Sequence, residues 1–239
     1  MRTTLVRRSV MTASAVCLAL VATACGSDEP AAKDGAKSPS KDGSSAPAAK
    51  ALTSAELEKL VLAQGDVPKH QITKSKEVIK SSDIVTDKAE CKPIGDAMML
   101  LPVGTAAASA ARVAAGEPTK PGDLLSVTAT SVLIASYEGD GAEQAVAQLK
   151  NAGQACAGGF TVTAKGEKNE VTGLAPATVT GGDEAVAATV SRKLDGESAQ
   201  TKLVVIRKGN TLVTLHAINF SGKTELPTAL MEAQLKKLG

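Results

Sequence analysis

Apolar residues recur at helical spacing in several parts of the chain. The clearest start is Thr53-Ser54-Ala55-Glu56, a capping box followed by an apolar stripe of Leu57, Leu60 and Val61. The same spacing predicts three further helices: a short one opened by Pro93, one over 141–154 capped by Asp140, and a last one over about 226–238. High alanine content predicts one more helix, over 105–115.

Alternating apolar positions and β-branched residues dominate the second half of the chain, where they predict strands. The predicted strands lie around Ile72, over 126–137, near 159–164, 169–172 and 184–192, and over 201–207 and 211–219. Lys208-Gly209-Asn210 turns the last two into a hairpin. Helices come early and last while strands cluster late, so the order predicts an α+β fold: a single domain with an antiparallel sheet covered by helices.

The first 24 residues have the pattern of a signal peptide. Arg2, Arg7 and Arg8 precede an apolar run over 10–24 that ends in small residues. The run is too short for a transmembrane helix, which needs about 20 residues. The Arg pair fits twin-arginine export as well as it fits the ordinary positive start of a signal peptide.

Cys25 stands directly after this run, and Ala22-Thr23-Ala24-Cys25 resembles the lipobox of bacterial lipoproteins. In that family the cysteine carries a diacylglycerol and becomes the mature N-terminus. Ala22-Thr23-Ala24 would also serve as a cleavage site for plain secretion. Lipidation is favoured because it leaves no odd exported thiol once Cys17 departs with the signal peptide. We therefore expect Cys25 to anchor the chain to the outer face of the cell membrane, because the two acyl chains of a diacylglycerol bind a bilayer stably.

The next segment, residues 26–51, contains no Val, Ile, Leu, Met or aromatic residue. Such a segment cannot bury enough apolar surface to offset its ordering entropy, so we expect a disordered tether. The sequence thus predicts a signal peptide over 1–24, a lipidated cysteine and tether over 25–51, and one domain over 52–239.

Cys91 and Cys156 remain as one pair in an oxidising compartment. A redox pair would favour close spacing such as C-x-x-C, whereas these cysteines are far apart in sequence. We expect a structural disulfide that ties the helix near Pro93 to the end of the helix over 141–154.

Composition excludes several classes of function. Removal of residues 1–24 leaves 24 Lys and Arg against 25 Asp and Glu, which argues against a nucleic-acid partner. The chain has no Trp, one Tyr and two Phe, too few rings for stacking on bases or sugars. His70 and His216 lie far apart and show no metal-ligand spacing, and Met98-Met99 is typical of a core rather than a copper site. No nucleophile elbow or phosphate-binding loop occurs, so we expect neither a metal, a cofactor nor catalysis.

Two segments resemble a known family. AVAQLKNAGQACAGGFTVT (145–163) is similar to part of the extracytoplasmic sensor domain of actinobacterial receptor serine/threonine kinases, where a helix also ends in a disulfide cysteine. VVIRKGNTLVTLHA (204–217), with the helix after it, resembles the closing part of that domain and also Mog1/PsbP-like lipoproteins. Together with the lipobox, this is similar to lipoproteins of the actinobacterial cell envelope. The resemblance implies an α/β sandwich with a cleft for an unidentified ligand, and no catalytic residue.

The sequence therefore favours a membrane-anchored, non-enzymatic module that binds an unknown ligand or an envelope protein. The alternative is a carrier of lipid or another apolar molecule, because the small aliphatic composition could line a cavity instead of filling it. An enzyme is the third hypothesis, which a cluster of strongly perturbed titratable groups in a cleft would favour.

Overall fold

The structure is a computed structural model that describes residues 50–75, 80–118, 120–194, 197–220 and 223–239. These residues belong to one compact unit. It is built on a single antiparallel sheet in the strand order β1-β3-β4-β9-β8-β7-β6-β5-β2. The nine strands of the described chain are β1 (His70–Lys74), β2 (Ile84–Thr86), β3 (Ala108–Gly116), β4 (Thr128–Ser136), β5 (Phe160–Ala164), β6 (Glu167–Pro176), β7 (Glu184–Leu194), β8 (Glu197–Lys208) and β9 (Thr211–Asn219).

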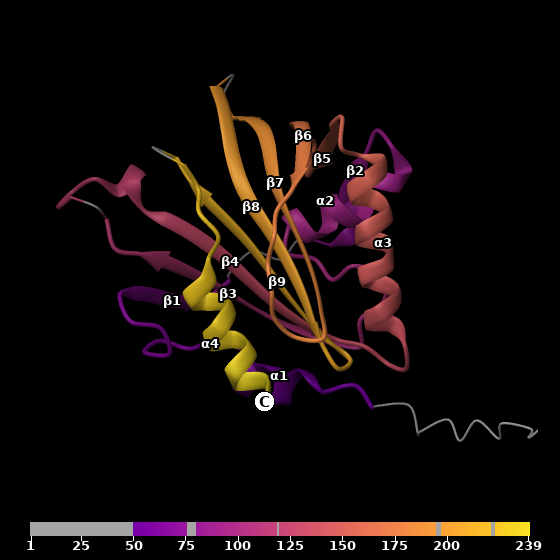
Figure 1. Ribbon diagram of the computed structural model, residues 1–239, viewed down its shortest axis with the longest axis vertical. Helices are drawn as coiled ribbons and strands as arrows, with labels where there is room; N and C mark the ends of the chain where they lie inside the picture. Colours follow the sequence, from indigo (N-terminus) through magenta and orange to yellow (C-terminus); the bar gives the residue numbers. More distant parts are fainter. Residues whose placement is uncertain (1–49, 76–79, 119, 195–196, 221–222) are drawn as a thin grey trace, which may run out of the picture. The chain divides into compact units, whose positions relative to one another are not determined.

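Helices cover both faces of this sheet. They are α1 (Ser54–Leu60), α2 (Lys92–Met98), α3 (Gly141–Ala155) and α4 (Thr228–Leu238), with short 3₁₀ turns at Ser81–Asp83, Ala89–Cys91 and Leu124–Ser126. Figure 1 shows α1 close to α4, and α2 close to α3, on either side of the strands. The α+β fold predicted from the order of elements is confirmed.

Each face of the sheet has its own hydrophobic core. On one face Leu57 of α1 and Leu230 of α4 pack with alternate residues of the central strands, such as Val204. On the other face Ile94 of α2 and Leu149 of α3 pack with the intervening residues, such as Val205. The central strands are buried on both sides, so β8 and β9 carry near-continuous apolar runs.

The helix predicted over the alanine-rich residues 105–115 is wrong, because Ala108–Gly116 form the strand β3. Their burial alternates along the strand, and β3 pairs with β1 on one side and β4 on the other. Helix propensity is a weak preference, and here the pairing and burial available on two sides outweigh it. The small side chains of β3 also allow α1 to lie directly on the sheet.

Local signals at the ends of elements are confirmed in most cases. Both hydrogen bonds of the capping box are present between Thr53 and Glu56 at the start of α1. The hairpin between β8 and β9 turns at Gly209-Asn210, with φ +58° at Gly209. Asp140 is the N-cap residue of α3, as predicted, but its side chain accepts from no backbone N–H and instead accepts from the side-chain amide of Gln144.

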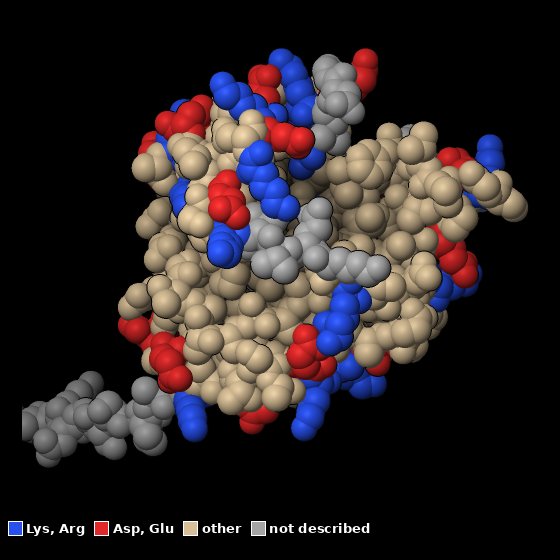
Figure 2. All heavy atoms as spheres, turned by 180° about the vertical axis from the view of Figure 1, so that it is seen from behind, with Lys and Arg blue, Asp and Glu red and all other residues tan. Residues whose placement is uncertain are grey.

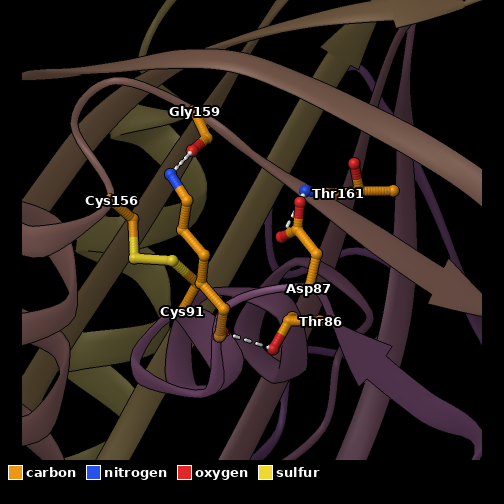
Figure 3. Close-up of a disulfide and its surroundings, with 7 residues drawn as sticks. Thr86, Asp87, Cys91, Cys156, Gly159 and Thr161 are labelled. Carbon is orange, nitrogen blue, oxygen red and sulfur yellow. Dashed lines mark hydrogen bonds between the residues drawn. A yellow bond between two sulfur atoms is a disulfide. The ribbon is translucent and has the colours of Figure 1, made fainter.

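A disulfide joins Cys91 to Cys156, as the cysteine count predicted, and both residues are fully buried. Figure 3 shows the contacts around it. Lys88 donates to the carbonyl of Gly159 at 2.7 Å, and the carboxylate of Asp87 accepts from the N–H of Thr161 at 2.9 Å. The bridge therefore fastens the start of α2 to the end of α3, and the two hydrogen bonds hold the segment before α2 against the start of β5.

Candidate functional site

A groove lies beside α2 on the sheet face that α2 and α3 cover. It has a volume of about 510 Å³, and we call it the β3–β4 groove. Most of its lining comes from residues 98–102 after α2, residues 109–113 of β3, and Ser131 and Leu133 of β4, and the rest from Glu58, Lys74 and Ser75. Figure 2 shows the molecule from the side opposite to that of Figure 1, with acidic and basic side chains interspersed among uncharged surface.

The segment after α2 forms one wall of this groove, and local hydrogen bonds fix its path. The N–H of Leu101 donates to the Asp96 carbonyl, and Leu100 takes a left-handed φ of +56°. Such a conformation is uncommon for a residue other than glycine. Opposite this wall, Ser109, Ala111 and Ser131 have small side chains, which leave the space open.

An ion-pair cluster borders the same groove at β1. Glu58 of α1 pairs with Arg112 of β3 and with Lys74 of β1, each at 2.9 Å. Hydrogen bonds from Arg112 and then Lys74 lower the pKa of Glu58 to about 2. The Arg112 guanidinium is nearly buried, yet it is fully compensated, because it also donates to the carbonyl of Ala111.

Polar side chains continue from the groove across the sheet face. His216 of β9 pairs in register with Ser131, and its Nε2 lies 2.9 Å from the hydroxyl oxygen of Thr201 on β8. Burial, and then the positive charge of Arg192 on β7, together lower the pKa of His216 to about 4, although a hydrogen bond to the carbonyl of Met98 acts in the opposite direction. His216 is therefore a neutral, hydrogen-bonded histidine at neutral pH.

A second groove on this face runs between α3 and strands β6 to β8. It has a volume of about 520 Å³, and we call it the α3 groove. Its lining is almost entirely aliphatic, with Lys150 and Gln154 as the polar exceptions. The lining residues are Ile94, Leu149, Lys150, Gly153, Gln154, Ala157, Leu174, Pro176, Val186, Ala187, Ala188, Leu203 and Val205.

The residues singled out from the sequence are only partly brought together. Cys25 lies outside the described residues. Met98 is buried and lines the β3–β4 groove with Met99, whereas His70 lies on β1, three strands away from His216. Within the described ranges no three His, Cys, Asp or Glu residues are placed to hold a metal ion. None of the helices described is long and apolar enough to cross a membrane.

Sequence reasoning missed Arg192 and the β3–β4 groove. The alternation of β7 does carry a signal for Arg192, since Val186, Ala188 and Val190 define an inward face on which Arg192 is the next position. The groove had no such signal. Its walls are separated by tens of residues, and one wall was predicted to be a helix.

The fold and the sequence are both similar to those of known extracellular domains. The family model described as PknH-like extracellular domain matches residues 44–237. Among solved structures, the crystal structure of the extracellular domain of PknH from Mycobacterium tuberculosis superposes with a TM-score of 0.53 at 15% identity. The match covers 79% of this chain and 96% of that one. No curated protein sequence matches the chain.

Proposed function

The chain belongs to the family of PknH-like extracellular domains, and on that premise we propose that it is a lipid-anchored, sensor-like module that binds a ligand without catalysing a reaction. The family places the domain outside the cytoplasm. A buried structural disulfide agrees with an oxidising compartment. In this proposal residues 1–24 are the signal peptide, 25–51 the lipidated cysteine and tether, and 52–239 the binding domain.

The β3–β4 groove is the observation that carries the binding role. It combines apolar walls from Met98, Met99 and Leu133 with hydroxyls from Ser109 and Ser131. Ligand sites are typically apolar concavities with a few placed polar groups. This lining suits a small ligand that has both apolar and hydrogen-bonding parts.

The α3 groove supports a second candidate, a carrier of lipid or another apolar molecule. Its walls are aliphatic on both the helix side and the sheet side. A Cβ placed on Gly153, at the mouth of this groove, would meet no atom within 4 Å. The groove is therefore open at this position of α3.

The anchor is tested by labelling with radioactive palmitate in an actinobacterial host. We expect label on the wild-type chain and its recovery with membranes, whereas Cys25→Ser should carry no label and appear in the medium. Cys17→Ser is the matched control and should remain labelled, because residue 17 leaves with the signal peptide. An unlabelled wild-type chain found in the medium would contradict the anchor.

The two binding roles are separated by native mass spectrometry of the exported Cys25→Ser chain, mixed with a lipid and metabolite extract of the cell envelope. Ser131→Leu fills the β3–β4 groove, and Gly153→Leu fills the α3 groove. Loss of the bound mass in Ser131→Leu alone supports the sensor-like module, and loss in Gly153→Leu alone supports the carrier. Asn151→Leu, on the exposed side of α3, is the control that should bind normally. A bare wild-type chain would contradict both roles.

A further inference from the structure

Arg192 is the one arginine of the described chain that has no acidic partner. Arg112 pairs with Glu58, and Arg207 lies within 4 Å of three carboxylates. Arg192 forms no ion pair or hydrogen bond with any residue described, and its Nε is buried without a partner. A guanidinium offers five N–H donors and accepts nothing, and in Arg192 the buried Nε–H has no acceptor.

The surroundings of Arg192 do not explain why a cation is held there. Arg192 lies on the sheet face that α2 and α3 cover. In the sheet it is paired with Val171 of β6 on one side and with Ala199 of β8 on the other. Burial lowers the pKa of Arg192, and no neighbouring charge contributes to that shift. Asp96 of α2 is the buried carboxylate of this layer, and it is already bound by Lys92 and Ser81. A partly buried charge without a counterion destabilises a fold, and here no internal group offsets that effect.

Arg192 lines neither groove, but it lies on the same sheet face as both of them. Its charge acts on the ring of His216, which pairs in register with Ser131 of the β3–β4 groove. His216 cannot replace a missing anion, because its ring is neutral at neutral pH and bonded to Thr201. An oxyanion that approached Arg192 would therefore meet an unpaired fork of donors and no competing carboxylate.

We propose that Arg192 is an anion-binding residue, which receives a phosphate or carboxylate group of the ligand that this face binds. A guanidinium binds such groups through two parallel N–H···O bonds, which gives both affinity and orientation. The proposal rests on the binding role proposed above and adds the chemical class of the ligand. It also accounts for an unpaired, partly buried charge, since the ligand supplies the counterion.

The test is a titration of the exported Cys25→Ser chain with inorganic phosphate and with acetate, followed by NMR of the arginine Nε–H signals. We expect a saturable shift of the Arg192 signal and a rise in the pKa of His216, because a bound anion offsets the charge that opposes its protonation. Arg192→Met should weaken binding at least tenfold, whereas Arg192→Lys, which keeps charge but loses the fork, should bind with intermediate affinity. Lys193→Gln removes one charge from the adjacent position, where Lys193 pairs with Glu170, and should change neither readout.

Vesicles distinguish the source of the anion. If phosphatidylglycerol vesicles but not phosphatidylcholine vesicles bind the wild-type chain, and Arg192→Met abolishes this binding, the anion belongs to a lipid headgroup. If only the soluble anions bind, it belongs to a free ligand. The proposal is overturned if neither anion nor vesicle shifts the Arg192 signal, or if Arg192→Met binds as well as the wild type. Binding of the envelope extract that persists in that case would leave the binding role standing without its anionic ligand.

Stability gives an independent readout that does not require a ligand. Because Arg192 is an uncompensated charge in the free protein, Arg192→Met should raise the urea midpoint of unfolding. Saturating phosphate should raise the midpoint of the wild type and leave that of Arg192→Met unchanged. A variant that is less stable than the wild type would show that Arg192 serves the fold, and would overturn the proposal.

Discussion

At the scale of single residues, His216 links the stability of this fold to pH. Its pKa is lowered to about 4, first by burial and then by Arg192. An unfolded histidine titrates near 6.5, so above that pH neither state binds the proton. Between pH 6.5 and 4 the unfolded state is protonated while the native state is not, so stability falls as pH falls. Below pH 4 both states are protonated, and the loss levels off.

The expected fall between pH 7 and 5 is about 2 kcal/mol, at about 1.4 kcal/mol for each unit below 6.5. His216→Gln keeps a side chain that can bond Thr201 but cannot titrate, so it should remove most of this fall. Urea unfolding at pH 7, 6 and 5 measures it. His70→Gln is the matched control, because His70 lies on the edge strand β1 and its ring lies against the carbonyl of the nearby Pro68. An unchanged pH dependence in His216→Gln would contradict the assignment.

At the scale of elements, sequence patterns predicted most of the helices and strands correctly. They failed where the pairing of strands distant in sequence determines the secondary structure. The capping box of α1 and the turn at Gly209-Asn210 are local, so a few adjacent residues were enough. The sequence predicted a helix over residues 105–115 because alanine favours helices. β1 and β4 lie on either side and pair with these residues as a strand, and the sequence does not show which strands will be neighbours. The same error hid the β3–β4 groove, one wall of which is β3. Arg192, by contrast, could have been found from the alternation of β7 alone.

The disulfide holds the short helix α2 in place. That helix is only seven residues long and holds its place through the bridge and through contacts with α3 and β2. Cys91 and Cys156 are 65 residues apart, and closing such a loop stabilises by about 4 kcal/mol in the chain-entropy model. We expect the double variant Cys91→Ser, Cys156→Ser to lose about that much free energy of unfolding in urea. A loss below about 1 kcal/mol would show that packing alone holds α2.

At the scale of the whole molecule, two hydrophobic cores share one sheet. Val204 faces one core and Val205 the other, so neither core can be lost without disturbing the strands that serve both. This arrangement predicts a single cooperative unfolding transition. The chain offers a local reporter for one core, because Tyr137, its only tyrosine, is buried on the α2 and α3 face and donates to the Val103 carbonyl.

Leu57→Ala tests this coupling from the far side of the sheet. Leu57 is fully buried in the core under α1 and α4, so its truncation should cost about 2–5 kcal/mol. If the sheet couples the two cores, the urea midpoint reported by Tyr137 fluorescence should fall by the same amount as the midpoint from circular dichroism. Leu149→Ala, equally buried on the side of Tyr137, is the matched control and should lower both midpoints together. If Leu57→Ala does not change the urea midpoint reported by Tyr137, the two cores unfold separately. The core on one face would then not stabilise the binding of a ligand on the other face.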